Sequence, residues 1–415
     1  MRSVPRQWRA AAAVLIAVLS IATATAPASG EVSAKQRSAA ELAKIAQVPD
    51  RMPLPQRDQI RVSNGADCEK PTKDGASACL TVVRPDKSTV AAPPGGEMST
   101  SAIQPMPQFC VDNPFTGWWV NRTSACSISG LRLTTTRTVN GVTTVTGEAN
   151  MNVYPYAYSS TTLQTIGYQI QLSMHNGWGD ARNASVSGGS NLVGACLTRS
   201  RQFPSQPLLP LNSFKDGEWY FDTTATAPGA IGHCDPTWEV TFTTSGYAPA
   251  TANYLTYAFR CDNATGGNPN VGCVVPQYPS ALLYFSSSYP ALASHVSRAQ
   301  ASGLPGATFD APLTRSTDAA VEARNRALAC GDAPSIDGKT CDEYPLATSR
   351  NGLSAGGARR IFDNCGFAPQ PGSGPDGASA CMITASENNA QGGLNTQFYR
   401  SERVLDGDPF RVIVI

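Results

Sequence analysis

The chain has 415 residues, a length that indicates two or three domains. Hydrophobic residues make up 41% and charged residues 15% of it, which excludes a wholly disordered protein. Lys and Arg total 32 against 31 Asp and Glu, so the chain is not a strongly basic protein that holds nucleic acid by bulk charge.

The N-terminus has the pattern of a secretory signal peptide over residues 1–28. Arg2, Arg6 and Arg9 precede an apolar run at residues 10–22, and small residues that suit signal peptidase follow. The run is short for a membrane span, and an uncleaved anchor is the alternative. The sequence thus predicts a secreted, extracellular protein with no stable membrane association after cleavage. Cleavage would leave 29 basic and 31 acidic residues, a formal charge of −2.

The cysteines agree with an oxidising compartment, because all 12 follow the predicted signal peptide and their number is even. Sequence alone does not fix their pairing, and six local disulfides are the economical expectation. Metal binding is the alternative, but the chain has no C-x-x-C motif and its 3 His are scattered. The expected pairs are Cys68–Cys79, Cys110–Cys126, Cys196–Cys234, Cys261–Cys273, Cys330–Cys341 and Cys365–Cys381.

Residues 29–105 are expected to form a leader and a linker. Residues 33–46 could form a short helix, because their apolar side chains recur on one helical face. Residues 91–104 are rich in Pro, Gly and Ser, which is typical of a flexible connector.

Residues 106–285 are predicted to form a β-rich, sandwich-like domain. A Thr- and Val-rich stretch at residues 131–146 is broken by Asn140-Gly141, a strong hairpin signal. Three tyrosines alternate along residues 154–158, and further short strands with turn signals follow. The aligned rings could bind glycans or bases, although core and cross-strand packing is the commoner role of such residues.

Residues 286–415 are expected to form a C-terminal module with its core at about 320–415. A helix is predicted at residues 319–329, with Thr317 or Asp318 as its N-cap. A mostly apolar strand is expected at the end of the sequence.

Two clusters in this module concentrate polar side chains. Residues 341–347 (CDEYPLA) place two adjacent carboxylates before an aromatic residue and a proline, and residues 386–398 (SENNAQGGLNTQF) combine a carboxylate with several amides. Such oxygen donors suit a hard cation such as Mg²⁺, which needs few protein ligands. No His follows His295, so a general base beyond it must be an acid, Lys, Tyr or Cys. Both patterns also occur on ordinary solvated surfaces and in polar loops.

The stretches CDEYPLATSRNG and ASENNAQGGLNTQFYRSERVLDGDPFRVIV resemble the NucA/NucB family of secreted bacterial deoxyribonucleases, in its actinobacterial branch. The resemblance covers about residues 300–415. It implies a small ββα-metal nuclease fold, in which two strands and a helix present one divalent cation, Mg²⁺ or Mn²⁺, to a DNA phosphodiester. The expected fold is therefore α+β overall, with a β-rich, sandwich-like N-terminal domain before a disulfide-stapled ββα-metal-type module.

The resemblance also implies roles for single residues. Asp342 matches the aspartate that replaces the usual histidine base in this family, and Glu343 matches its acidic neighbour, which ligates the ion or supports its ligands. Asn388 and Glu387 match the step that holds the metal. The residues expected to contact the substrate are Gln391, Asn395, Gln397, Arg359, Arg360, Arg400 and Arg403. For the arginines, the alternative is that each forms an ordinary ion pair on the surface.

The sequence departs from the family pattern in three respects. The smallest members have an Arg before the Asp-Glu pair, where this chain has Cys341, which is expected to pair with Cys330 and anchor the strand. Residues 355–381 form a longer segment than in those members. Residues 321–415 contain nine Arg and Lys against eleven Asp and Glu, so DNA binding is expected to be weak, metal-dependent and salt-sensitive.

The sequence thus predicts a secreted, metal-dependent endodeoxyribonuclease with little sequence preference, because no base-reading helix is evident. One alternative is a cell-envelope or glycan-binding protein with a degenerate nuclease module, which would use the tyrosine strand together with Trp118 and Trp119. Another is an enzyme that acts on RNA.

Overall fold

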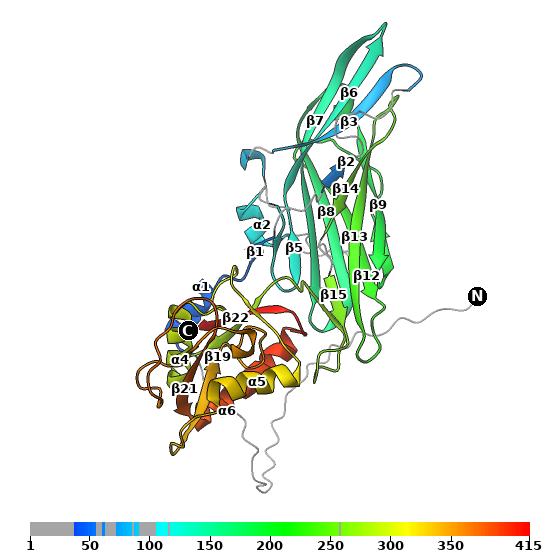
Figure 1. Cartoon of the computed structure of the whole chain (residues 1–415). Helices are drawn as coiled ribbons and strands as arrows, with labels where there is room; N and C mark the ends of the chain where they lie inside the picture. Colours follow the sequence, from blue (N-terminus) through cyan, green and yellow to red (C-terminus); the bar gives the residue numbers. More distant parts are fainter. Residues whose placement is uncertain are drawn as a thin grey trace, which may run out of the picture.

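An elongated β domain lies beside a smaller C-terminal module that carries the three longest helices of the described residues (Figure 1). The computed structural model describes residues 37–54, 60–62, 72–84, 87–90, 105–114, 117–256 and 259–415. The predicted signal peptide, the expected connector at residues 91–104 and Cys68 lie outside these stretches.

The first sheet of the β domain has nine strands. Its strands β6 and β7 form the predicted hairpin: Asn140 and Gly141 both have positive φ, as a two-residue turn of this type requires. The strands are β1 (Met52–Pro53), β3 (Ala76–Val83), β4 (Trp119–Val120), β5 (Ser124–Cys126), β6 (Ser129–Val139), β7 (Val142–Ser160), β8 (Leu163–Trp178), β10 (Cys196–Gln202) and β12 (Phe214–Thr223).

The second sheet has seven strands and is built around β13, whose residues are alternately buried from Gly232 to Phe242. This period of two means that one face of the strand packs on the core. The strands are β2 (Ile60–Val62), β9 (Ser185–Gly194), β11 (Gln206–Pro207), β13 (Ile231–Thr243), β14 (Ala250–Leu255), β15 (Phe259–Asp262) and β16 (Gly272–Val274).

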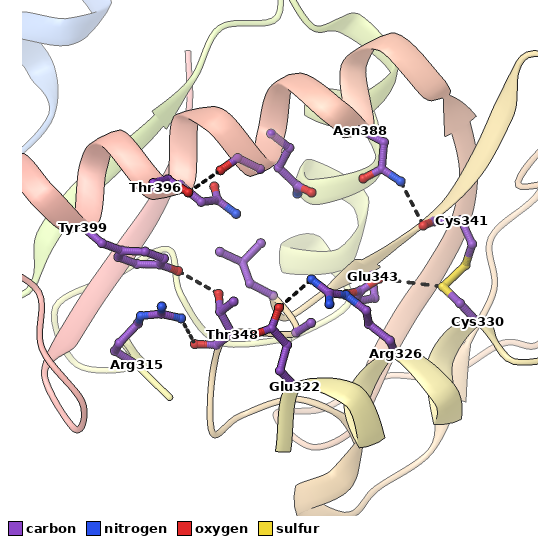
Figure 2. A pocket seen from close by; sticks show the side chains of 15 residues that line it. Arg315, Glu322, Arg326, Cys330, Cys341, Glu343, Thr348, Asn388, Thr396 and Tyr399 are labelled. Atoms are coloured by element: carbon purple, nitrogen blue, oxygen red, sulfur yellow. Dashed lines mark hydrogen bonds and ion pairs between the residues drawn. A yellow bond between two sulfur atoms is a disulfide. The ribbon is translucent and has the colours of Figure 1, made fainter. Parts of the chain in front are cut away.

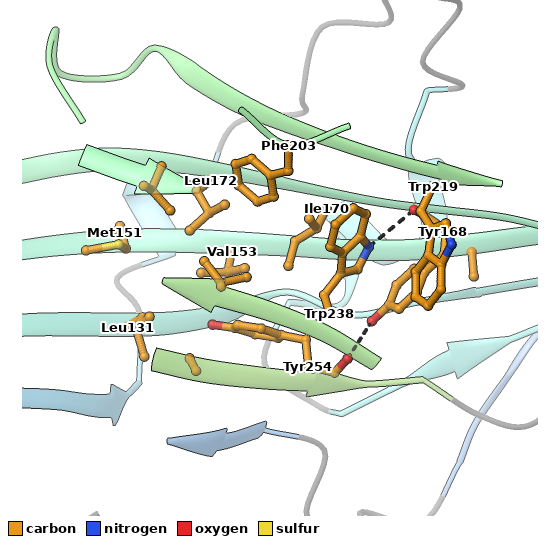
Figure 3. Packing of buried hydrophobic residues seen from close by; sticks show 14 of the residues in the cluster. Leu131, Met151, Val153, Tyr168, Ile170, Leu172, Phe203, Trp219, Trp238 and Tyr254 are labelled. Atoms are coloured by element: carbon orange, nitrogen blue, oxygen red, sulfur yellow. Dashed lines mark hydrogen bonds between the residues drawn. The ribbon is translucent and has the colours of Figure 1, made fainter. Parts of the chain in front are cut away.

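The two sheets face each other across a hydrophobic core that draws buried side chains from both, so the domain is β-rich, as expected. Trp219 of the first sheet and Trp238 of the second are fully buried, with ring centroids 5.6 Å apart. The indole of Trp238 also donates a hydrogen bond of 3.2 Å to the carbonyl oxygen of Tyr168 (Figure 3). Burial of such large rings is the main source of stability in a sandwich of this kind.

The predicted tyrosine strand lies in β7, and its rings pack instead of facing solvent. Tyr154 and Tyr156 are buried, and Tyr154 contacts Phe214 with ring centroids 5.5 Å apart. Tyr158 shares a hydrogen bond of 3.0 Å with the hydroxyl of Tyr220. The packing role expected for these residues is confirmed, and the exposed aromatic face that motivated the glycan-binding alternative is missing from the described part of this strand.

The segment expected to be a leader and linker contributes to both parts of the molecule, so that expectation was too simple. Helix α1 (Ala39–Gln47) begins with a capping box formed by Ser38 and Glu41. Glu41 also accepts a hydrogen bond from Ser287 of the C-terminal module, while β1, β2 and β3 pair within the sandwich. The remaining short elements outside that module are η1 (Lys87–Thr89), α2 (Gln108–Asp112) and α3 (Gly179–Arg182).

The C-terminal module contains two three-stranded sheets and three helices. One sheet has the order β17 (Ser280–Tyr284), β22 (Pro409–Val414), β18 (Leu313–Thr314), and the other has the order β19 (Lys339–Tyr344), β21 (Ala378–Thr384), β20 (Arg359–Arg360). The helical elements are α4 (Pro290–Ala301), α5 (Ala319–Cys330), η2 (Leu353–Ala355) and α6 (Ala385–Ser401).

Two features of this module bear on the sequence predictions. Helix α5 is capped by Asp318, whose side chain accepts a 2.8 Å hydrogen bond from the backbone of Ala320, as predicted. Strand β17 pairs in parallel with β22, whereas the sequence predicts residues 280–284 to belong to the β-rich domain. The module therefore begins before the expected boundary at residue 286.

A buried ionic cluster joins the two parts of the molecule. Asp408 of the module accepts from Arg122 at 3.1 Å and from Arg260 at 2.5 Å, and Arg403 donates to Asp262 at 2.8 Å. All five side chains are less than a tenth exposed. Because buried charges are costly unless paired, this interface fixes the domains relative to each other.

The described cysteines form five disulfides, and none of these cysteines is free. Each expected local pair that lies fully within the described residues is present. The pairs are Cys110–Cys126, Cys196–Cys234, Cys261–Cys273, Cys330–Cys341 and Cys365–Cys381. Within the same residues, no helix has both the length and the hydropathy needed to cross a membrane.

Candidate active site

A cavity of about 510 Å³ lies between α5, β19 and α6 (Figure 2). Both predicted polar clusters reach it: Glu343 comes from the first cluster, and Asn388, Gln391 and Asn395 come from the second. This cavity, here called the catalytic pocket, therefore gathers one predicted carboxylate and three predicted amides.

Strand β19 separates the two adjacent carboxylates. Asp342 is 1% exposed, and its Oδ2 lies 2.6 Å from Nδ1 of His295 on α4. The other ring nitrogen of His295 lies 2.9 Å from the hydroxyl of Ser379 on β21. Successive side chains on a strand point to opposite faces, so Asp342 faces α4 while Glu343 faces the catalytic pocket. The structure does not place Asp342 where a catalytic base is expected.

One feature of the sequence is consistent with a polar contact at His295. His295 lies on the helix face that also carries the buried Leu292, Val296 and Ala299. A histidine among apolar residues on a buried helix face needs a polar partner. That partner is 47 residues away in the sequence, so the pattern of α4 alone could not identify it.

Glu343 is the carboxylate that the fold makes chemically unusual. Burial raises its pKa to about 7, and the nearby negative charge of Asp342 adds to this effect. Arg326, whose Nε lies 3.7 Å from Glu343, acts in the opposite direction, although it is mainly paired with Glu322 at 2.6 Å. Glu343 thus loses its proton close to neutral pH.

Helix α6 supplies the amide wall of the catalytic pocket. Asn388 donates two hydrogen bonds of 2.9 Å, to the hydroxyl of Thr340 and to the carbonyl of Cys341, and its side-chain oxygen points away from that strand (Figure 2). Asn395 accepts a hydrogen bond of 2.6 Å from the hydroxyl of Tyr284. Gln391 is 7% exposed, and its Nε2 has no hydrogen-bond partner among the described residues.

Glu387, expected to hold the metal with Asn388, lies outside the catalytic pocket. Its carboxylate accepts a hydrogen bond of 2.9 Å from the backbone nitrogen of Leu292, in the first turn of α4. This position favours a negative charge, because backbone N–H groups are unpaired at a helix start. Neighbouring residues on a helix point about 100° apart, so Glu387 and Asn388 serve different faces.

Three of the arginines expected at phosphates are used elsewhere. Arg359 forms a two-pronged ion pair with Asp332, and Arg360 is buried against backbone carbonyls that include that of Ser302. Arg403 is fully buried in the ionic cluster between the domains. None of the three lines the catalytic pocket, so the structure does not bring them to the other predicted site residues.

The arginines that do reach the catalytic pocket are Arg315 and Arg326, which the sequence analysis missed. Arg315 stacks on the ring of Tyr399 at 3.9 Å and donates a hydrogen bond of 3.0 Å to the carbonyl of Thr348. The remaining expected contacts, Gln397 and Arg400, line a second groove on α6.

The disulfide Cys330–Cys341 forms part of the pocket wall and ties the end of α5 to β19. The sulfur of Cys330 lies 3.7 Å from Oε2 of Glu343. The expectation that Cys341 pairs with Cys330 and anchors this strand is confirmed.

The donor set in the catalytic pocket fits a hydrated hard cation. The carboxylates of Glu322 and Glu343 and the amides of α6 offer only oxygen atoms as ligands. Across the part of the chain that the structure describes, no group of three or more His, Cys, Asp and Glu residues could hold a metal. Oxygen donors of this kind are the ligands of hard cations such as Mg²⁺, which keeps several of its waters.

Comparison with known proteins agrees with this geometry. Residues 303–413 match the family model described as Deoxyribonuclease NucA/NucB, while no curated protein matches the chain. The match includes every residue that lines the catalytic pocket, and it supports a deoxyribonuclease. The C-terminal module therefore contains a NucA/NucB deoxyribonuclease domain, at residues 303–413.

Proposed function

We propose that the protein is a secreted endonuclease that hydrolyses DNA phosphodiester bonds with the help of a divalent cation and with little sequence preference. The observation that carries this proposal is Glu343, a carboxylate with a pKa near 7 in a pocket opposite Asn388. A general base works best when its pKa is close to the working pH. The order of β19, β21 and α6, two antiparallel strands followed by a helix, supports a ββα-type site.

In this mechanism Glu343 takes over the role that the family resemblance implied for Asp342. Ionised Glu343 accepts a proton from a water molecule, whose oxygen attacks phosphorus as the bond to the 3′ oxygen breaks. Asp342 acts as a positioning residue: its contact with His295 ties β19 to α4, and its charge raises the pKa of Glu343.

Asn388 is the residue proposed to hold the cation. Its two N–H groups are used by Thr340 and Cys341, which fixes the amide and leaves its oxygen available as a ligand. When bound, Mg²⁺ or Mn²⁺ would stabilise the negative charge of the phosphoryl group. Glu322 is a second candidate ligand, because it lines the same pocket.

Substrate binding is proposed to use few positive charges. Arg315 and Arg326 line the catalytic pocket and are the phosphate contacts that the geometry favours. Residues 321–415 have nine basic and eleven acidic side chains, so DNA affinity should fall steeply with salt and depend on the cation. The five disulfides are consistent with a secreted protein.

Cleavage of supercoiled plasmid DNA tests this function. The protein is incubated with Mg²⁺ or Mn²⁺, or with EDTA, and a matched RNA digestion runs in parallel. We expect nicking that requires the cation, that is lost in Glu343→Gln, and that persists in Glu239→Gln, an exposed control in the sandwich. Equal cleavage by Glu343→Gln would remove Glu343 as the base, and failure of the unmodified protein to cleave DNA would refute the proposal.

A further inference from the structure

A second groove, of about 640 Å³, lies where the sandwich domain meets α6. A loop of the sandwich forms one side through residues 267–269, and α6 forms the other. The two sides are held together, because Arg400 Nε donates to the carbonyl of Gly266 at 3.1 Å and Asn268 Nδ2 donates to the carbonyl of Arg400 at 3.4 Å. This cavity is called the α6 groove below.

The α6 groove is continuous with the catalytic pocket. Gly392 and Thr396 line both cavities, so the two meet along one face of α6. Gln391, which precedes Gly392 on α6, lines the catalytic pocket; it is nine-tenths buried, and its Nε2 has no hydrogen-bond partner within the described residues. An unpaired buried N–H donor at this position is suited to an oxygen acceptor on a ligand.

Two glycines lie in the middle of the 17-residue helix α6, Gly392 where the two cavities meet and Gly393 next to it in the α6 groove. Gly392 and Gly393 are both exposed, and a Cβ atom added at either would meet no atom within 4 Å. Glycine weakens a helix interior, and here it does not serve close packing within the protein. Because glycine has no side chain, another backbone can approach the helix closely at this position.

The charge of the α6 groove suits a polyanion. Its lining includes Asn268, Thr396, Gln397 and Arg400 but no carboxylate. Arg400 is exposed and forms no ion pair with any described residue. A guanidinium without an ion-pair partner, beside hydroxyl and amide groups, is a typical phosphate contact.

We propose that the α6 groove binds the sugar-phosphate backbone of the DNA that flanks the scissile phosphate. In this arrangement the sandwich domain is part of the substrate site, through the loop at residues 267–269. The inference rests on the proposed nuclease function and adds a binding surface to it. It also gives a physical role to Arg400 and Gln397, two of the predicted substrate contacts.

The test introduces a positive or a negative charge at Gly393, which lines the α6 groove but not the catalytic pocket. Gly393→Lys and Gly393→Glu have similar helix propensities, so their effects on stability are matched. Ser297→Lys and Ser297→Glu, at an exposed position of α4, are the controls. Binding of a labelled 20-base-pair duplex is measured by fluorescence anisotropy with Mg²⁺, in the full chain carrying Glu343→Gln.

A single charge at about 7 Å from a phosphate in water changes the dissociation constant roughly threefold. We therefore expect Gly393→Lys to bind roughly threefold tighter and Gly393→Glu roughly threefold weaker at low salt, with both Ser297 variants unchanged. In chains that retain Glu343, hydrolysis of bis(p-nitrophenyl) phosphate, which is small enough for the catalytic pocket alone, should stay within about twofold of the parent.

Unchanged duplex binding in both Gly393 variants would overturn the α6 groove while leaving the nuclease proposal standing. A parent protein that neither binds nor cleaves DNA would refute both proposals. Altered binding of the same size in the Ser297 variants would show a general charge effect, and would also overturn the groove.

Discussion

Replacement of Glu343 by Gln should make the protein more stable at alkaline pH while abolishing its activity. The carboxyl has a pKa of about 7 in the folded protein against an ordinary value of 4.5, mainly because burial disfavours its charged form. Its folded pKa is raised, so the folded state binds the proton more tightly than the unfolded chain does. Wild-type stability therefore decreases as the pH rises from about 4.5 through about 7.

The magnitude follows from the difference between the two pKa values, about 2.5 units at roughly 1.4 kcal/mol each. Ionised Glu343 should thus cost the wild-type protein about 3 kcal/mol at pH 8 and less than about 1 kcal/mol at pH 5. Its side chain is only 14% exposed, so solvent screening reduces this cost little. Gln has nearly the shape of the protonated carboxyl and does not ionise, so Glu343→Gln should recover that energy.

The assay is urea denaturation at pH 5 and pH 8 in EDTA, because a bound cation would favour the ionised carboxylate. Circular dichroism is the suitable signal, since all 6 Trp residues lie outside the C-terminal module. The gain in stability should appear at pH 8 and nearly vanish at pH 5, and the exposed control Glu239→Gln should change little at either pH. A Glu343→Gln protein that is no more stable than wild type at pH 8 would refute the reasoning about burial.

Three further predictions test neighbouring parts of the structure. Asn388→Ala should raise the Mg²⁺ concentration for half-maximal cleavage by about tenfold or more and weaken thermal stabilisation by Mg²⁺, whereas Asn388→Asp should resemble wild type in both measurements. Equal Mg²⁺ titrations for wild type and the two variants would exclude Asn388 as a ligand. Asp342→Asn should shift the midpoint of the pH–activity profile below about 7 and keep the alkaline plateau, because it removes a charge that raises the pKa of Glu343; a plateau about 100-fold lower would restore Asp342 as the base. Asp408→Ala should lower the free energy of unfolding by about 3–5 kcal/mol, since it removes the ion-pair partner of the buried Arg122 and leaves the buried Arg260 with only its longer contact to Asp262. A loss below about 1 kcal/mol would show that the ionic cluster does not hold the domains.

Sequence reasoning succeeded where the signal is local. The hairpin at Asn140-Gly141 and the cap at Asp318 depend on the preferences of a few adjacent residues. The described disulfides also join cysteines that lie near each other in the sequence. In each case the partner was within the stretch under consideration.

The sequence could not decide which member of the Asp-Glu pair faces the substrate. Both orientations of β19 satisfy the same residue pattern, and the choice depends on α4, which brings His295 to Asp342. The sequence could not place the predicted arginines for a similar reason, since Arg403 pairs with Asp262, which is 141 residues away in the sequence. Partners far apart in the sequence leave no periodic signal, so these contacts required the tertiary structure.

The order of strands in the small β17–β22–β18 sheet has a consequence for the timing of folding. Its middle strand, β22, is also the last of the three to be synthesised, and Phe410 on it packs against Phe398 and Tyr399 of α6, with ring centroids 6.0 Å and 5.6 Å apart. A nascent chain that has not reached residue 409 therefore carries every pocket side chain without the support that positions α6. Under the proposed function, nuclease activity would begin only after β22 has been synthesised and has joined its sheet, which delays a DNA-cutting protein while it is still close to the DNA of the cell that makes it.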